Sequence, residues 1–290
     1  MLSILIPVYN FDCSKLITSL HYQASNAGIQ FEILVYDDCS TKLLYLDSSI
    51  LSLSNLKYKT MEVNLGRSAI RNLLASDAKY TNLLFIDCDC LPNDEKYIQR
   101  YISKIGFSDC VCGGTLYPDR NKIKSYQKLH WLYGTKREMK VNEKVPPIFV
   151  SSNFLIKKEV FESILFDDKI KGYGHEDTIF GIMLLKKGYS LTHIDNPIIH
   201  WGLNNTSKFL LNAKMASKNL RKLYDNPQYC NDLLNIRLVQ TWQQLHIFKI
   251  DSLLWLLSVL LLPFCEHQLK SKHPSLRVLD FYKLLHFIHK

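Results

Sequence analysis

The stretch Leu83-Leu84-Phe85-Ile86-Asp87-Cys88-Asp89-Cys90 decides the fold of this 290-residue chain. Four consecutive apolar residues end in two aspartates one residue apart, and Leu91-Pro92 then stops the run. Such a run is typical of a strand buried on both faces, as in a parallel sheet. Carboxylates at the carboxyl end of such a strand lie where open α/β sheets bind ligands. A divalent ion carrying substrate phosphates would hold the two charges together, but the pattern alone favours a strand that merely ends in a polar turn.

The residues around this strand show the same alternation of strand and helix. Apolar runs at 2–8, 31–36 and 56–63 read as strands, and apolar helical stripes follow near residues 16–20, 43–46 and 67–75. Alternation at this spacing predicts βαβ units and a mostly parallel sheet. Two of the other predicted strands are also followed by polar side chains, Tyr9-Asn10 and Asp37-Asp38. There is no G-x-G-x-x-G and no Walker A motif, which disfavours a dinucleotide dehydrogenase or a P-loop enzyme.

The composition indicates a globular protein with an anionic partner. Hydrophobic residues make up 47% and charged residues 22%, which is globular, and the net charge of +9 suits an anionic partner such as a nucleotide or an anionic membrane. No basic and aromatic motif of a nucleic-acid module is present, so we expect no nucleic-acid partner. The eight cysteines form no Cys-x-x-Cys pair, and we expect them to be reduced in a cytoplasmic protein. The N-terminus starts as a strand and does not resemble a signal peptide.

The second half of the chain contains one more acidic cluster. A strand at 109–116, broken by Gly113-Gly114, precedes an irregular, basic excursion at 117–147, and a strand at 148–156 and a helix at 157–164 follow. Gly172-Tyr173-Gly174-His175-Glu176-Asp177 then leads into a helix, where the acidic pair suits either an N-terminal cap or a functional role. The extended segment 197–202 carries a lone His200, and a lone histidine is usually structural.

From Thr206 onward the pattern is helical, so we expect a catalytic domain at 1–204 and a helical extension at 205–290. Leu253–Leu262 is the most apolar stretch, and it is shorter than the roughly 20 residues of a spanning helix. It suits a core helix or an interfacial segment, and Trp255, Lys270 and Lys272 favour contact with a membrane.

Five motifs then fall into one order. They are Ser3-Ile4-Leu5-Ile6-Pro7-Val8-Tyr9-Asn10, Val35-Tyr36-Asp37-Asp38-Cys39-Ser40, Asn64-Leu65-Gly66-Arg67-x-x-x-Arg71-Asn72, Phe85-Ile86-Asp87-Cys88-Asp89 and Gly174-His175-Glu176-Asp177. Together they resemble the inverting family 2 glycosyltransferases of the GT-A fold, over roughly residues 1–200. The segment before Asp177 is also similar to chondroitin-polymerase and β-1,4-galactosyltransferase domains. The C-terminal third is similar to that of bacterial surface-polysaccharide members, which work at the inner face of the cell membrane.

The resemblance implies a Rossmann-like, mostly parallel sheet flanked by helices, and it implies roles for single residues. Those that would surround the nucleotide-sugar are Pro7 and Tyr9 at its border, Asp37 and Asp38 on the uracil or ribose, Arg71 on the base or a phosphate, and Asp87 on the ribose or donor sugar. Asp89 would ligate Mn²⁺ or Mg²⁺, and His200 falls where related enzymes place a second metal ligand. Asp177 would be the general base, with Glu176 orienting acceptor or donor.

The implied reaction is metal-dependent transfer of a hexosyl or N-acetylhexosaminyl group from a UDP-sugar to a glycan or lipid-linked acceptor. A single displacement needs a base for the incoming hydroxyl and a Lewis acid for the leaving diphosphate, and no enzyme nucleophile. A nucleotidyltransferase is the alternative enzyme, but it would need a glycine-rich, basic loop in place of Pro7-Val8-Tyr9-Asn10. A non-catalytic scaffold that binds nucleotide-sugars and membranes is the alternative from another class, and the retained acidic residues disfavour it.

Overall fold

A computed structural model describes residues 1–42, 46–139 and 148–289, and these form two compact units. The first unit contains Met1–Pro118, Arg137–Ile170 and Glu176–Gly202. The second contains Asp119–Lys136, Lys171–His175 and Leu203–Lys290. The sequence suggested one boundary after residue 204, whereas in the structure two inner segments join the C-terminal helices. They do so because their contacts are made there, as in the hydrogen bond from Asn219 Nδ2 to the Gly174 carbonyl oxygen (2.7 Å).

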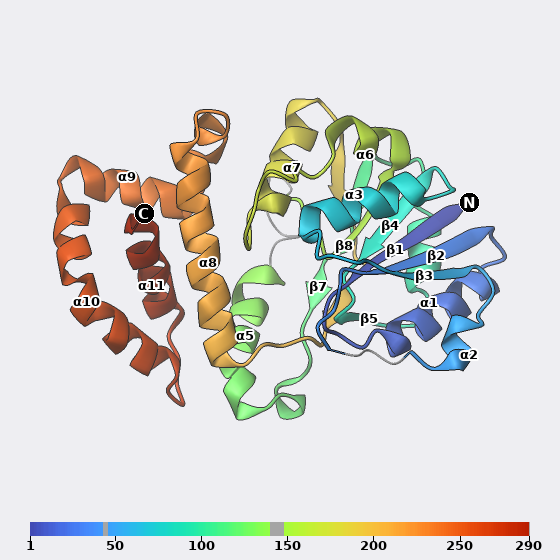
Figure 1. Cartoon of the computed structure of the whole chain (residues 1–290), viewed down its shortest axis with the longest axis horizontal. Coiled ribbons are helices and arrows are strands. Elements are labelled where there is room, and N and C mark those ends of the chain that lie inside the picture. Colours follow the sequence, from blue (N-terminus) through green and yellow to red (C-terminus); the bar gives the residue numbers. More distant parts are fainter. Residues whose placement is uncertain (43–45, 140–147, 290) are drawn as a thin grey trace. The chain divides into compact units, whose positions relative to one another are not determined.

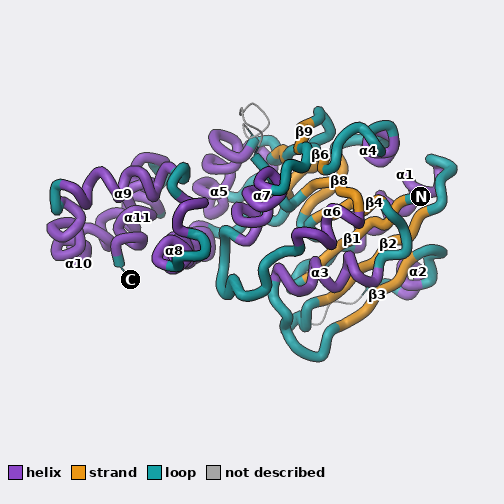
Figure 2. Tube along the Cα trace, turned by 90° about the horizontal axis from the view of Figure 1, so that it is seen from above, coloured by secondary structure: helices purple, strands orange, loops and turns teal. Residues whose placement is uncertain are grey.

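The first unit is built on a seven-stranded, mostly parallel sheet, as the sequence predicted (Figure 1). Its order is β3 (Leu56–Thr60), β2 (Phe31–Asp37), β1 (Leu2–Val8), β4 (Asn82–Ile86), β8 (Asn153–Lys157), β6 (Cys110–Cys112) and β9 (Leu191–His193), with β8 antiparallel to both neighbours. Figure 2 shows these strands side by side from β3 to β9. Leu83 to Ile86 are fully buried, which explains the uninterrupted apolar run of β4.

Helices cover both faces of this sheet because alternate strand residues point to opposite sides. Ile4 and Ile6 of β1 pack in the same cluster as α1 (Ser14–Asn26) and α4 (Tyr97–Ile102), near α2 (Ser48–Leu51). Leu5 belongs to the opposite cluster, with α3 (Arg67–Asp77), α6 (Lys158–Ile164) and α7 (Glu176–Lys186). Figure 1 shows α3 and α6 on one side of the sheet and α1 and α2 on the other.

The strand expected at 109–116 is two strands in two different sheets. Its first part is β6, and its second part, β7 (Thr115–Leu116), joins a three-stranded sheet with β10 (Ile198–His200) and β5 (Cys90–Pro92). The change of sheet occurs at Gly113-Gly114, where a Cβ on Gly113 would lie 2.3 Å from the Asn196 carbonyl oxygen. The small sheet places His200 opposite Cys90, immediately after the Asp87-Cys88-Asp89 segment.

Two local predictions need correction, and a third lies partly outside the described residues. Residues 117–147 are not irregular throughout, since they contain η1 (Arg120–Lys122), η2 (Ser125–Gln127), α5 (Lys128–Tyr133) and η3 (Gly134–Glu138). In this segment Leu129 is buried in one cluster with Phe209. Residues 140–147, and Leu43-Leu44 of the helix expected near 43–46, lie outside the described residues, and the described helix there is α2. The strand expected from 148 begins only at Asn153.

The second unit is helical. It contains α8 (Thr206–Asp225), η5 (Cys230–Leu233), α9 (Arg237–Ile247), α10 (Ile250–Leu269) and α11 (Leu276–Ile288), with α10 and α8 packed against α11. The apolar stretch Leu253–Leu262 is therefore only the middle of a 20-residue helix, longer than the sequence suggested. In the part of the chain that the structure describes, α10 alone is long and apolar enough to cross a membrane, with a mean hydropathy of 1.5.

Candidate active site

The candidate site lies at the carboxyl ends of the central parallel strands. The order β3-β2-β1-β4 reverses direction along the sheet between β1 and β4, and ligands of open α/β sheets bind at such a switch point. Tyr9 follows β1, Asp37 ends β2 and Asp38 follows it, and Asp87 follows β4. The predicted polar residues of these three strands therefore share one edge of the sheet.

Two buried carboxylates at the end of β2 are held by donors. Asp37 accepts hydrogen bonds from the Tyr58 hydroxyl (3.1 Å) and from the Ser40 backbone N–H (2.9 Å). Asp38 accepts from the backbone N–H groups of Leu65 (2.6 Å) and Gly66 (2.9 Å), at the start of α3. Asp38 thus fixes the loop that leads into α3.

Pro7 and Tyr9 form the neighbouring part of the edge. Pro7 lies within β1, in register with Tyr36, while the Tyr9 side chain is 47% exposed just after the strand. The next residue, Asn10, has a φ of 54°, and its backbone N–H donates to Ser40 Oγ at 2.7 Å. The loops after β1 and β2 are therefore tied together, with an exposed aromatic ring beside them.

Arg71, which is buried, forms an ion pair with the partly exposed Asp87. Arg71 Nη2 lies 2.6 Å from Asp87 Oδ1, and Arg71 is only 2% exposed. Arg71 Nη1 also donates to the Arg67 carbonyl oxygen at 3.1 Å, while no described residue accepts from Arg71 Nε. Asp87 is fixed from its other side, since its backbone N–H donates to the Ser152 carbonyl oxygen at 3.1 Å.

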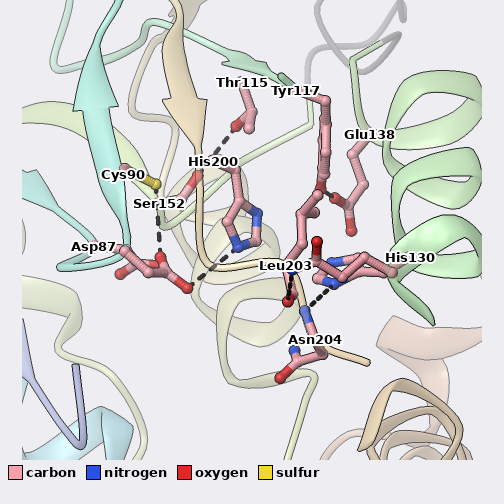
Figure 3. A network of polar contacts seen from close by, with 12 residues as sticks. Asp87, Cys90, Thr115, Tyr117, His130, Glu138, Ser152, His200, Leu203 and Asn204 are labelled. Atoms are coloured by element: carbon pink, nitrogen blue, oxygen red, sulfur yellow. Dashed lines mark hydrogen bonds and ion pairs between the residues drawn. The ribbon is translucent and has the colours of Figure 1, made fainter. Parts of the chain in front are cut away.

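Asp89 and His200 meet although 111 residues separate them along the chain. His200 Nε2 lies 3.2 Å from Asp89 Oδ2, and Figure 3 shows the imidazole directed toward the strand end that carries Asp87. Burial lowers the pKa of His200, but the Asp89 carboxylate outweighs burial and the pKa rises to about 9. Burial raises the pKa of Asp89, but His200 outweighs it, so the net pKa of this carboxyl is lowered.

The backbone after His200 also encloses Asp89. The N–H groups of Trp201 and Gly202 donate to the Asp89 carbonyl oxygen, at 2.9 and 3.1 Å. A Cβ at Gly202 would lie 2.4 Å from both Asp89 Cβ and Oδ2, so only glycine fits. One carboxylate oxygen and one imidazole nitrogen so positioned fit a divalent cation, whose adjacent ligand atoms lie about 3 Å apart.

Glu176 and Asp177 occupy the first turn of α7, where the helix dipole favours carboxylates. Glu176 Oε1 accepts from Arg67 Nε at 2.9 Å, and its side chain is buried. Asp177 Oδ1 accepts from the Thr178 backbone N–H at 2.7 Å. Burial, and next the Glu176 charge, raise the pKa of Asp177, against the opposing effect of Arg67 and Arg71.

Arg67 belongs to the motif Asn64–Asn72, but the sequence alone indicated no role for it. Its guanidinium binds Glu176 and lies 4.0 Å from Asp87, so it reaches two acidic clusters that are distant in sequence. The spacing of Arg67 and Arg71, four residues apart on a helix, places both on one face and could have indicated this. No sequence pattern indicated a second contact, in which the Tyr117 hydroxyl donates to Glu138 and the Tyr117 ring lies 5.5 Å from that of His200 (Figure 3).

Comparison with known proteins bears on the family of this chain. The model of the family "Glycosyl transferase family 2" matches residues 3–165. Chondroitin synthase of Escherichia coli is 28% identical over 182 residues, which is 61% of this chain but only 25% of the length of that protein.

Two solved structures resemble this chain to different degrees. The mannosyltransferase PcManGT from Pyrobaculum calidifontis, in complex with GDP-Man and Mn²⁺, has a TM-score of 0.55 at 14% identity, over 78% of this chain and 64% of its own. S. aureus TarS 1–349, in complex with UDP-GlcNAc, has a TM-score of 0.46 at 15% identity, over 99% and 89%. Because the family match spans more than half of the chain, this chain belongs to glycosyl transferase family 2 and has the GT-A fold.

Proposed function

We propose that the chain is a metal-dependent, inverting glycosyltransferase that moves a hexosyl or N-acetylhexosaminyl group from a UDP-sugar to a hydroxyl group. The acceptor would be a glycan or a lipid-linked sugar in surface-polysaccharide synthesis, at the inner face of the cell membrane. The observation that carries the proposal is the pairing of Asp89 with His200 at 3.2 Å beside two further acidic clusters. In this proposal residues 1–204 supply the catalytic domain and 205–290 a helical, membrane-contacting extension.

The nucleotide would bind across the ends of β1 and β2. Asp37 and Asp38 offer carboxylate acceptors there, the exposed Tyr9 ring can border the base, and Arg71 stabilises Asp87 for contact with the ribose or sugar. The mannosyltransferase of similar fold is known with GDP-Man and Mn²⁺, which supports a nucleotide-sugar and a divalent ion. The choice of uridine rests on the sequence motifs, so a guanosine donor is the alternative to test.

Asp89 and His200 would hold Mn²⁺ or Mg²⁺. When bound, the ion would stabilise the negative charge on the leaving diphosphate. Neutral imidazole is the form that ligates a metal, so the proton shared by His200 and Asp89 must leave when the ion binds. The raised pKa of His200 therefore predicts tighter metal binding as the pH rises toward 9.

Asp177 would take the proton from the acceptor hydroxyl as that oxygen attacks the anomeric carbon. One displacement inverts the configuration, and the bond to the diphosphate breaks as the new bond forms. A carboxylate with a raised pKa is a stronger base than an ordinary aspartate, provided that it is ionised at the working pH. Glu176, held by Arg67, would orient the acceptor or the donor sugar.

A thermal-shift panel of UDP, GDP and their sugars, with and without Mn²⁺, tests the proposal, followed by transfer assays with the stabilising donor. We expect stabilisation that needs the metal, because a ligand that binds only the folded state raises the melting temperature. Asp89→Asn should abolish it and reduce transfer by about a thousandfold or more.

Asp109→Asn is the matched control, because Asp109 forms an ion pair with Lys157 (2.8 Å) at the opposite edge of the sheet. Binding of UTP with sugar 1-phosphate and release of pyrophosphate would instead indicate a nucleotidyltransferase. Metal-dependent binding without turnover of any donor would indicate a scaffold.

A further inference from the structure

Helix α10 carries a large apolar surface that nothing in the described structure covers. The exposed apolar residues at the end of α9 and along α10, here called the α10 face, are Ile247, Phe248, Ile250, Leu253, Trp255, Leu256, Leu257, Val259, Leu260 and Phe264. No Asp, Glu, Lys or Arg occurs from residue 252 to residue 265. Isolated exposed apolar residues are ordinary, but a contiguous set of this size marks an interaction surface.

The opposite side of α10 packs against α11 within the second unit. Cys265 and Leu269 are buried in one cluster with Leu279 and Tyr282 of α11. Ser258 is also buried, and its Oγ lies 2.6 Å from Nε2 of His289, the residue just beyond α11. Since α11 carries charged residues at Arg277, Asp280 and Lys283, a helix held against it is placed to lie along a membrane surface rather than to cross the bilayer.

Charge indicates which kind of surface is complementary. Residues 203–290 contain twelve Lys and Arg against five Asp and Glu, so this segment has most of the net positive charge of the chain. Lys249 precedes α10, and Lys270 and Lys272 follow it. An apolar helix face with lysines at its ends and a tryptophan within it is the pattern of a helix that binds anionic membranes in the interface.

We propose that the α10 face docks on an anionic lipid bilayer, with α10 in the plane of the interface and its exposed apolar side chains among the lipid acyl chains. The proposal deepens the membrane contact named under the proposed function, and it assigns that contact to particular residues, to an orientation and to a lipid charge. It does not depend on the transferase activity, and its test uses no activity readout.

The test is co-sedimentation of the full chain with vesicles of phosphatidylcholine alone or with about 30% phosphatidylglycerol. We expect binding to the anionic vesicles that weakens as salt is added, because salt screens the lysines. Leu256→Glu/Leu260→Glu, at side chains 66% and 75% exposed, should lower the partition coefficient about tenfold or more. Phe107→Glu changes an equally exposed aromatic residue (64%) in the first unit and should bind like the unchanged protein.

Trp255, 53% exposed, reports the orientation directly. Its fluorescence should shift to the blue on anionic vesicles and be quenched most by lipids brominated near the headgroup, and Trp255→Phe should remove this change. Strongest quenching by bromines at the bilayer centre, together with resistance to alkaline extraction, would show a spanning helix and overturn the in-plane orientation.

Two further results would overturn the proposal. One is equal vesicle binding by Leu256→Glu/Leu260→Glu and by Phe107→Glu. The other is a dimer in light scattering that only the α10 double variant dissociates, with no vesicle binding, which would assign the α10 face to a second copy of the chain. Both results count only if the double variant has normal circular dichroism. If it is unfolded, the single variant Leu260→Glu, a smaller change at an exposed position, repeats the test.

Discussion

The acidic edge of the sheet, formed by the carboxylates of the candidate site, and the α10 face differ in how their side chains are paired. At the acidic edge, carboxylates that would repel one another are each held by a named donor: Asp38 by backbone N–H groups, Asp87 by Arg71, Asp89 by His200 and Glu176 by Arg67. On the α10 face, by contrast, ten apolar side chains are exposed, and no described residue covers them. The first region is organised in advance for a small charged ligand, whereas the second needs an extended apolar partner.

Removing the proposed base should have the largest effect. Asp177→Asn is expected to lower kcat by about 10²- to 10⁴-fold, because in the proposed mechanism this carboxylate takes the acceptor proton, while nucleotide binding stays unchanged. Single-turnover kinetics and the thermal shift with nucleotide separate the two quantities. Vesicle binding should not change, and a loss of vesicle binding in this variant would contradict the independence of the two regions.

The raised pKa of Asp177 also fixes the sign of a pH effect. The base must be ionised, so kcat should fall as the pH decreases through a value above the ordinary pKa of an aspartate. A rate that stays constant down to the pH of an ordinary aspartate would argue against Asp177 as the base.

Gly202→Ala should act on the proposed metal ligand, Asp89, alone. The new Cβ would overlap Asp89 at 2.4 Å and displace its carboxylate, so we expect metal affinity to fall about 10- to 100-fold. Titration with Mn²⁺ in the presence of nucleotide measures this. Gly188→Ala is the control, because no atom lies within 4 Å of a Cβ there, although its positive φ adds some strain.

Arg67 should have a smaller effect through its neighbours. Arg67→Gln removes the cation that holds Glu176 and opposes the raised pKa of Asp177, so the acid limb of the kcat profile should move to higher pH and kcat should fall about tenfold. Arg67→Lys should restore part of the profile because it restores the charge. An unchanged pH profile in Arg67→Gln would show that Arg67 only packs there.

The smallest expected effect is that of the His200–Asp89 pair on the melting temperature of the metal-free protein. The pKa of His200 is raised to about 9 from an ordinary 6.5, so its stabilising effect is complete below about pH 6.5 and is lost as the pH rises through 9. The pKa of Asp89 is lowered, so its contribution to the stability of the folded state is present above its ordinary pKa of 3.8 and is lost as the pH falls below that value. Melting temperatures of the unchanged protein and His200→Gln should therefore converge between pH 7 and about 9.

The sequence determined the features that depend on neighbours along the chain. The buried run Leu83–Ile86 could only be a central strand, and the aspartates after it had to lie at its carboxyl end. The same holds for the start of α7 at Glu176 and for the helical stripe of α3. The ordered motifs also identified the family, because each is a short local segment.

Only the tertiary structure decided the features that depend on contacts across the chain. A pattern of local periodicity contains no information on which distant residues meet, so the pairing of Asp89 with His200 and that of Arg67 with Glu176 required the folded chain. The same applies to the change of sheet at Gly113, which follows from the nearby Asn196 carbonyl, and to residues 119–136, which join the helical unit because Leu129 is buried with Phe209. For α10, the sequence supplied the apolar residues, but packing against α11 decided which of them stay exposed.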